Sequence, residues 1–269
     1  MNLTVNSHTT YCYTGGKDFN AAQPTVVFIH GVLNDHSVWI LQSRWFAHHG
    51  WNVLALDLPG HCRSSGAPPR SVEEAARFVI ALLDAAGVRR AALVGHSFGS
   101  LIALEVAATA PDRVSQLVLV GTAFPMKVSP ALLDASLNQP QQAIDMVNQF
   151  SHSTLAPPPS SLGPGTWLYG GSRALMRRVL ASNRQHNVFH TGFKACDDYK
   201  TGEVQMQSVQ CATLFIVGRY DQMTPPKAAV ALAAKARDAK VVTLAAGHAL
   251  MTEAPDGVLF ALRDFLRAA

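Results

Sequence analysis

The chain alternates between short apolar runs and longer segments in which apolar residues recur at helical intervals. The apolar runs occupy 24–31, 52–60, 91–94, 115–123, 211–218 and 239–247. Short runs rich in Val, Ile and Leu predict buried strands. Because they are continuously apolar, they favour a parallel sheet that is covered by helices on both faces.

The segments between these runs predict helices, at 37–50, 71–87, 100–110 and 255–269. In the second of them, Ser71 and Glu74 have the spacing of a capping box, and Gly87 stands where a helix should end. Strands that alternate with helices in this way are built from βαβ units. The sequence therefore predicts an α/β fold.

One stretch, residues 124–205, interrupts the alternation. It contains repeated prolines, helical pieces around 131–150 and 172–181, and no convincing strand. The Pro- and Gly-rich segment 156–165 predicts a loop between helical pieces. We therefore expect a core formed by 1–123 and 206–269, with 124–205 inserted as a helical unit.

Composition narrows the class of protein. The chain has 269 residues, of which 48% are hydrophobic and 15% charged, as expected for a globular protein with one large core. The net charge of +4 is small and no basic cluster concentrates it, so a nucleic-acid partner is not expected. No apolar run reaches the ~20 residues of a membrane span, and the polar start lacks a secretory signal. We expect a cytoplasmic protein.

The cysteines and histidines give no metal motif. The four cysteines have no CxxC spacing and are interpreted as free thiols, and the histidines have no HExxH or similar spacing. The sequence therefore predicts no metal site.

The strongest chemical signal is Gly95-His96-Ser97-Phe98-Gly99, which lies between a predicted strand and a predicted helix. A serine on this forced turn is presented as a nucleophile, and the glycines on either side leave room for the neighbouring backbone. The alternative is a tight glycine turn that holds an ordinary surface serine.

A serine nucleophile needs a base, and the base needs a carboxylate. His248 follows the last predicted strand, and Asp221 follows the strand before it. The carboxyl ends of parallel strands meet at one edge, so these residues should converge on Ser97. Asp57, at another strand end, is a rival for the acid, although we favour a loop-bracing role for it. His96 is expected to have a packing or pocket role.

The reaction also needs donors for the oxyanion that forms when serine attacks a carbonyl. The backbone N–H of Phe98, directly after the nucleophile, is one candidate. The other is the backbone N–H of Val32, in the turn that leaves the first predicted strand. His30, in the same turn, is interpreted as a residue that hydrogen-bonds to the loop and also borders the substrate pocket.

These blocks together resemble the α/β hydrolase fold superfamily over nearly the whole chain. The resemblance is carried by "FIHGVLNDHSVW", "LALDLPGHCRSSG", "LVGHSFGSLIALEVA", "LFIVGRYDQMTPP" and "AAGHALMTEAPD", and the order Ser97, Asp221, His248 is that of the family. It implies a mostly parallel eight-stranded sheet, whose first strands lie within residues 1–20, and a helical lid after the sixth strand. It also implies a mechanism without a cofactor. Cys62 departs from the usual family block.

The resemblance implies a serine hydrolase, because dehalogenases and epoxide hydrolases of this fold carry aspartate in place of Ser97. The apolar side chains within 124–205 favour a small or medium, largely apolar carboxylic ester as its substrate. The substrate is then a small molecule held in a pocket. The residues expected to line that pocket are His30, Leu33, Phe124, Met126, Phe150 and Trp167.

Two alternatives stay open. The first is a C–C bond hydrolase of meta-cleavage products, in which the cations Arg173, Arg177, Arg178 or Lys194 recognise a carboxylate, although we favour solvation of a helix surface as the explanation of these charges. The second is a ligand-binding or sensing protein of the same fold. The sequence leaves the oligomeric state and the physiological substrate open.

Overall fold

An eight-stranded sheet forms the centre of the protein in the computed structural model, which describes residues 1–20, 22–153 and 167–266. The strand order is β1-β2-β4-β3-β5-β6-β7-β8. Strands β3 to β8 pair with one another in parallel, whereas β2 is antiparallel to both β1 and β4. The strands are β1 (Asn2–Val5), β2 (His8–Tyr13), β3 (Thr25–Ile29), β4 (Asn52–Leu56), β5 (Ala91–His96), β6 (Val114–Val120), β7 (Thr213–Gly218) and β8 (Ala239–Leu244). The predicted mostly parallel α/β sheet is confirmed.

The strand order reverses beside β3. The chain passes from β3 outward to β4 and then returns across the sheet to β5, which pairs with the other side of β3. Loops that leave two such strands diverge, and the crevice between them is where open α/β sheets bind ligands. The loops after Ile29 and after His96 border this crevice.

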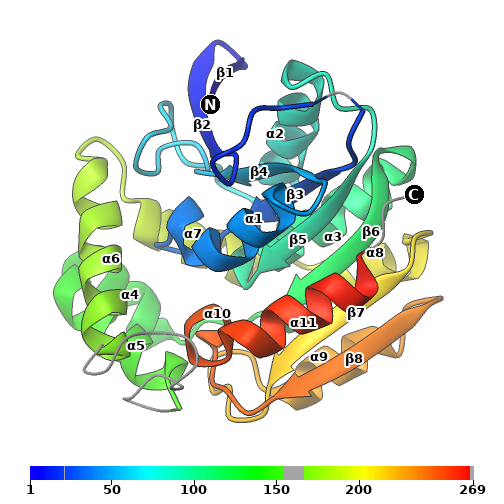
Figure 1. The fold of residues 1–269 in the computed structure, drawn as a ribbon. Coiled ribbons are helices and arrows are strands. Elements are labelled where there is room, and N and C mark those ends of the chain that lie inside the picture. Colours follow the sequence, from blue (N-terminus) through cyan, green and yellow to red (C-terminus); the bar gives the residue numbers. More distant parts are fainter. Residues whose placement is uncertain (21, 154–166, 267–269) are drawn as a thin grey trace.

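Helices cover both faces of the sheet (Figure 1). One face carries α1 (Ile40–Ala47), which follows the short 3-10 helix η1 (His36–Trp39), and α11 (Pro255–Phe265), which follows α10 (Leu250–Glu253). The other carries α2 (Val72–Ala85), α3 (Phe98–Thr109) and α9 (Pro226–Ala233). Alternate residues of one strand serve the two layers: Val26 and Phe28 pack toward α1, and Val27 and Ile29 pack toward α2 and α3. This explains why the strands are apolar throughout.

Strand β8 differs from the expectation of a strand buried on both faces. It lies at the edge of the sheet, and Lys240, Val241 and Thr243 are exposed. Because one edge of β8 has no neighbouring strand, its polar residues keep contact with water, and charged residues on such edges disfavour pairing with other chains.

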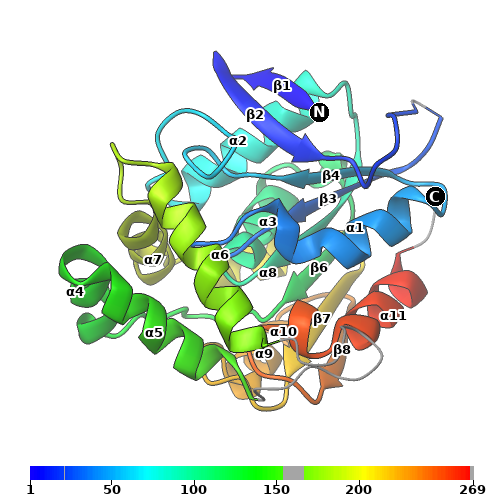
Figure 2. The same cartoon turned by 60° about the vertical axis from the view of Figure 1, so that its left-hand side comes forward.

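The insertion between β6 and β7 is helical. It contains α4 (Pro130–Asn138), α5 (Pro140–Ser151), α6 (Leu168–Ser182), α7 (Val188–Asp198) and α8 (Gly202–Ser208). Figures 1 and 2 both show α4, α5 and α6 grouped at one end of the sheet. Sequence patterns indicated helices near α4, α5 and α6 but missed α7 and α8. The predicted loop 156–165 lies outside the described residues.

The insertion has an apolar core of its own. Leu132, Ile144, Met176 and Phe189 are buried against one another, each from a different helix. Leu33, from the loop after β3, is fully buried in the same cluster. The insertion is therefore anchored on the loop that borders the crevice. No helix over the described ranges is long and apolar enough to cross a membrane.

A buried acid joins α3 to the end of the insertion. Glu105 is 4% exposed, and it accepts hydrogen bonds from the Tyr199 hydroxyl at 2.8 Å and from the Gln205 amide at 3.1 Å. Burial raises the pKa of the Glu105 carboxyl above its ordinary value, and the hydrogen bond from Tyr199 offsets this only in part. The carboxylate form is therefore disfavoured in the folded protein.

Glu105→Gln is expected to raise the midpoint of thermal unfolding at pH 8. A pKa raised by folding means that the charged form destabilises the fold once the pH exceeds both the unfolded and the folded pKa, whereas below the unfolded pKa the cost is absent. The gain measured at pH 8 should therefore shrink at pH 4. Exposed Glu203→Gln on α8 is the matched control. A midpoint lowered equally at both pH values would contradict the assignment.

Candidate active site

Ser97 occupies a strained turn between β5 and α3. Its backbone has φ 53° and ψ −119°, a region that costs of order 1–3 kcal/mol for a residue with a side chain. The Ser97 N–H donates to the Val120 carbonyl at 2.9 Å, and the Ser97 carbonyl accepts from the Ser100 N–H at 2.8 Å. A side chain on Gly95 would overlap the Gly99 carbonyl, so the turn requires the close approach that glycine allows.

Asp221 and His248 lie together at the ends of β7 and β8. The His248 Nδ1 is 2.8 Å from Asp221 Oδ2, and both side chains are almost fully buried. Asp221 Oδ1 accepts from the backbone N–H groups of Met223 and Thr224, at 2.8 and 2.7 Å. The Thr224 hydroxyl donates to Asp221 Oδ2 at 2.6 Å. The carboxylate is thus held on both oxygens.

These contacts fix the charge of Asp221 and the tautomer of His248. Burial opposes ionisation, but the adjacent His248 and the hydrogen bonds from His248 and Thr224 outweigh it, so the pKa of Asp221 lies below its usual value. A carboxylate only accepts hydrogen bonds, so Nδ1 of His248 carries the proton. Its Nε2 is then left with a lone pair, as a general base requires.

His96 contacts both the backbone and the ring of His248. Its Nε2 is 2.9 Å from the His248 carbonyl, and the two rings are 4.7 Å apart. Because a carbonyl only accepts, Nε2 carries the proton and His96 is neutral. Burial, followed by the nearby His248, lowers the pKa of His96 to about 3. His96 is therefore a neutral brace next to Ser97.

Ser97 and His248 both line the same two cavities. A cavity of about 630 Å³ and a smaller one of about 240 Å³ are both lined by Ser97, His248, Phe193 and Met223. Over residues 1–20, 22–153 and 167–266, the Ser97 hydroxyl makes no hydrogen bond. The hydrogen bond between a catalytic hydroxyl and its base is often long in a free enzyme and shortens when substrate binds. The larger cavity also contains Val32, Val38, Ile40, Leu41, Val147, Leu168, Leu175, Met176 and Met251, from both the core and the insertion.

The predicted pocket residues are divided among several places. Trp167 lines the larger cavity, and Met126 and Phe150 line the smaller one. Leu33 packs into the core of the insertion, and neither cavity includes it. His30 and Phe124 also lie outside both linings. Phe124 packs against Tyr199, 5.9 Å between ring centroids.

The two predicted oxyanion donors lie on the loops that border the crevice. Phe98 is the first residue of α3, so its N–H has no acceptor within the helix. Val32 lines the larger cavity and precedes Leu33, whose φ of 55° is unusual for a branched side chain. Val32 and Ser97 both line this cavity.

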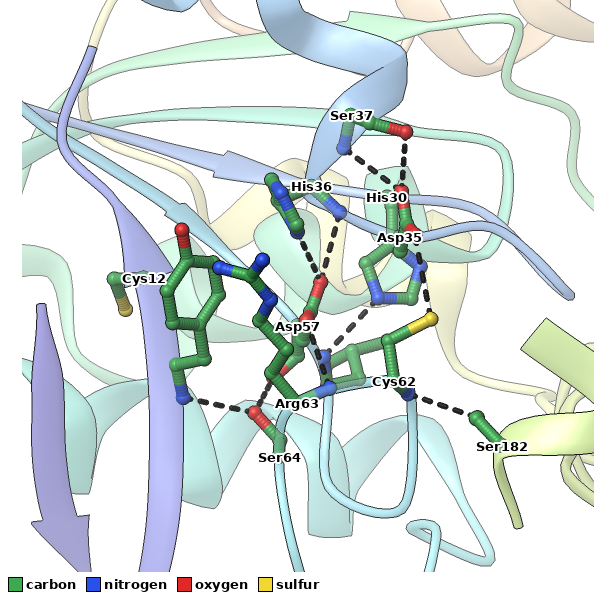
Figure 3. Close-up of polar contacts among 12 residues, drawn as sticks. Cys12, His30, Asp35, His36, Ser37, Asp57, Cys62, Arg63, Ser64 and Ser182 are labelled. Atoms are coloured by element: carbon green, nitrogen blue, oxygen red, sulfur yellow. Dashed lines mark hydrogen bonds and ion pairs between the residues drawn. The ribbon is translucent and has the colours of Figure 1, made fainter. Parts of the chain in front are cut away.

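A polar network behind this loop holds it in place (Figure 3). His30 accepts from the Leu58 N–H at 3.1 Å, and its Nδ1 is 2.8 Å from the Gly31 carbonyl. Asp57 accepts from the backbone N–H and from Nδ1 of His36, at 2.9 and 2.7 Å. The loops after β3 and β4 are therefore tied together. Asp57 binds His36, not His248, so the rival acid serves as a brace.

Asp35, His36 and Asp57 form a group whose ligand atoms all lie within 4.8 Å of one another. Such a group has the residue types of a metal site, but protein donors already use its oxygens. Asp35 accepts from the N–H and hydroxyl of Ser37, from the Cys62 thiol at 3.3 Å, and from Arg178 at 2.6 Å. The donor set fits a loop brace better than a cation site.

This network reaches the insertion. Arg178, on α6, binds Asp35, and the Ser182 hydroxyl accepts from the Cys62 N–H at 3.0 Å. Burial, reinforced by the negative charge of Asp35, raises the pKa of the Cys62 thiol to about 12, so Cys62 stays a neutral donor. The other predicted carboxylate-binding cations also have protein partners: Arg173 with Asp145, Arg177 with Gln141, and Lys194 with Asp198.

Two residues at this site were missed by the sequence patterns. Thr224 orders the Asp221 carboxylate, and Glu253 contacts the loop of His248. The Asp-x-x-Thr spacing before Pro225 is a helix-start signal that would have pointed to Thr224. Glu253 carries no comparable signal.

The sequence has relatives of known family. A family profile described as alpha/beta hydrolase fold matches residues 24–255. The chain belongs to the α/β hydrolase fold family. Among curated proteins, Lipase LipV of Mycobacterium tuberculosis is 37% identical over 119 residues, which are 43% of this chain and 44% of that protein. A 2-hydroxy-6-oxononadienedioate/2-hydroxy-6-oxononatrienedioate hydrolase of Paraburkholderia phymatum is 36% identical over 111 residues, 39% of this chain and 38% of that one.

These matches span less than half the length of either curated protein. Solved structures match over nearly the whole chain. The enol-lactonase from Burkholderia xenovorans has a TM-score of 0.83 at 22% identity and covers 98% of this chain and 99% of its own. The esterase from Exiguobacterium antarcticum has a TM-score of 0.82 at 16% identity, with 98% of each chain covered. At these identities the likeness shows the fold alone.

Proposed function

We propose that the protein is a serine hydrolase that cleaves a small or medium, largely apolar carboxylic ester through an acyl-enzyme. The observation that carries this proposal is the 2.8 Å contact between His248 and Asp221, with His248 in the same cavity walls as the strained Ser97. The family membership of the chain supports the same reaction class.

In the proposed reaction, Ser97 Oγ attacks the ester carbonyl carbon while His248 Nε2 takes the hydroxyl proton. The negative charge that develops on the carbonyl oxygen is stabilised by the N–H groups of Val32 and Phe98, each worth ~3 kcal/mol of barrier in comparable sites. The intermediate then collapses, and His248 returns the proton to the departing alcohol. Water attacks the acyl-enzyme by the same route, releasing the acid and restoring Ser97.

The shape of the site supports an apolar substrate. The larger cavity lies within the ~300–1,000 Å³ range of small-molecule sites, and aliphatic side chains dominate its wall. Residues of α5, α6 and α7 contribute to that wall, so we propose that the insertion 124–205 acts as the lid of the site. Arg178 is the one predicted cation in this wall, and it is paired with Asp35.

That pairing favours an ester over a dicarboxylate dienoate. A dienoate substrate needs a cation that is available to its carboxylate, and the four predicted cations already have protein partners. C–C bond hydrolysis and ligand binding without hydrolysis are the two alternatives that the following test distinguishes from ester hydrolysis.

The test is covalent labelling by a fluorophosphonate, together with turnover of activated acyl esters of increasing length and one meta-cleavage dienoate. We expect labelling of Ser97 and hydrolysis of the esters, with the dienoate slower. Faster turnover of the dienoate would favour C–C hydrolysis. Resistance to the label, with no ester hydrolysed, would favour a binding protein.

Trp167→Ala is expected to raise KM for the longer acyl esters by about tenfold, equivalent to ~1.4 kcal/mol, and to leave the acetate ester nearly unchanged. Trp167 lines the larger cavity although it is 58% exposed, so it offers apolar surface to a long chain near the cavity mouth. Phe260→Ala, which removes an exposed aromatic ring outside both cavities, is the control. An equal loss on acetate and long-chain esters would rule out this role.

A further inference from the structure

The backbone that carries His248 is held on both sides by residues outside the proposed triad. The Nε2 of His96 donates a hydrogen bond to the His248 carbonyl. The N–H of Ala249, the next residue, donates to the Ser151 carbonyl at 3.0 Å. Ser151 is the last residue of α5, so the insertion contacts the histidine loop directly.

Glu253 supplies a second contact of this kind. It ends α10 and is 3% exposed, and its carboxylate turns back toward the start of that helix. Its Oε2 accepts from the Gly247 N–H, immediately before His248, and from the Ser153 hydroxyl at 3.0 Å. Its Oε1 accepts from the Ser153 N–H at 2.6 Å. One buried carboxylate thus bridges the histidine loop and the residues that follow α5.

The space around Gly247 shows how closely these segments pack. A Cβ on Gly247 would lie 2.6 Å from the Ser151 carbonyl oxygen and 2.9 Å from the Ser153 nitrogen. Real Cβ atoms essentially never approach backbone so closely. The close contact between these two segments therefore depends on glycine before the histidine.

We propose that Glu253 is a positioning residue that couples the seating of the helical insertion to the placement of His248. This inference rests on the proposed function of Ser97, Asp221 and His248. If the end of α5 moves, the Ser153 donors leave the carboxylate, and the carboxylate in turn releases the Gly247 N–H. The base then loses its register with Ser97, so the covering of the site and the competence of the base change together.

Glu253→Gln tests the proposal with little change in size. Glutamine replaces one acceptor oxygen by an NH₂ donor, which then faces a backbone N–H or the Ser153 donors. We expect kcat on a preferred ester, and the rate of fluorophosphonate labelling, to fall by about tenfold to a hundredfold, because small misplacements of a catalytic group have losses of this size. KM should change by less than about threefold, since Glu253 lines neither cavity.

Ser153→Ala tests the same contact from the side of the insertion, because Ser153 donates to the Glu253 carboxylate. It removes the hydroxyl donor but keeps the N–H, so its kcat should fall less than that of Glu253→Gln. The double variant should lose less than the product of the two single losses, because both act on one carboxylate. This second variant also keeps the test open if Glu253→Gln fails to fold.

Glu203→Gln, the same chemical change on exposed α8, is the control and should leave labelling and turnover unchanged. Thermal unfolding of every variant separates misplacement from loss of the fold. Labelling of Glu253→Gln and Ser153→Ala at the wild-type rate would overturn the proposal. Multiplicative losses in the double variant, or a rise in KM with unchanged kcat, would do the same. Failure of the wild-type protein to label would instead remove the proposed function.

Discussion

Ser97→Ala is expected to reduce kcat on a preferred ester by about 10⁶-fold and to abolish labelling by a fluorophosphonate. In the proposed mechanism Ser97 provides the oxygen that forms the acyl-enzyme, and no neighbouring hydroxyl shares its position on the turn. Ser100, the nearest serine in sequence, is fully buried and donates to the Ser97 carbonyl and to Thr122. It therefore cannot replace the nucleophile.

The same substitution should change the free energy of unfolding by no more than about 0.5 kcal/mol, because the Ser97 hydroxyl makes no hydrogen bond within the described ranges. Intact-mass measurement after labelling, burst kinetics and thermal unfolding check these points. Ser208→Ala is the matched control, since Ser208 is an exposed residue at the end of α8 and lines neither cavity. Retention of labelling in Ser97→Ala would place the nucleophile elsewhere and end the proposal.

Asp221→Asn is expected to lower kcat by about 10⁴-fold. The asparagine NH₂ can face His248 Nδ1, and this favours the tautomer whose proton sits on Nε2, where the lone pair is needed. The remaining hydrogen bonds from Met223 and Thr224 should keep the loop in place. The loss should therefore lie in kcat and in the labelling rate, with KM little changed.

Asp57→Asn discriminates between the two acids. Asp57 is fully buried and holds His36 and the Arg63 N–H, so its substitution should lower the unfolding midpoint and affect kcat far less than Asp221→Asn does. The opposite ranking of the two variants would make Asp57 the catalytic acid.

The lowered pKa of Asp221 adds a stability signature. A carboxyl whose pKa is depressed by folding stabilises the protein above its unfolded pKa, and this contribution is lost as the pH falls toward the folded pKa. The unfolding midpoint of wild type should therefore fall toward that of Asp221→Asn in acid, and the two should differ most at neutral pH.

The features that the sequence predicted well are those fixed by strand ends. Ser97, Asp221 and His248 each follow a continuous apolar run. In a parallel sheet the carboxyl ends of such runs share one edge, regardless of the conformation of the loops. The fold class follows from the same pattern. The placement of the three residues could therefore be expected without knowledge of any side-chain contact.

The features that were missed depend on packing between distant segments. The contact of Glu253 with Ser153 joins residues one hundred positions apart and depends on how α5 seats on the histidine loop. Leu33 was expected in the pocket, but its positive φ turns it into the core of the insertion. Helix α7 was missed, although its buried residues recur at helical intervals, because Gly192 is unfavourable within a helix and its apolar face is completed only by contact with α4 and α3.

The unequal sizes of the two cavities have a stereochemical consequence. Ser97 and His248 line both cavities. Only one enantiomer of a substrate with one bulky and one compact substituent can therefore place the bulky group in the larger cavity and the compact group in the smaller one. Its mirror image must force the bulky group into the smaller space. A racemic ester would accordingly be consumed one enantiomer first, which makes the fold around Ser97 a starting point for kinetic resolution.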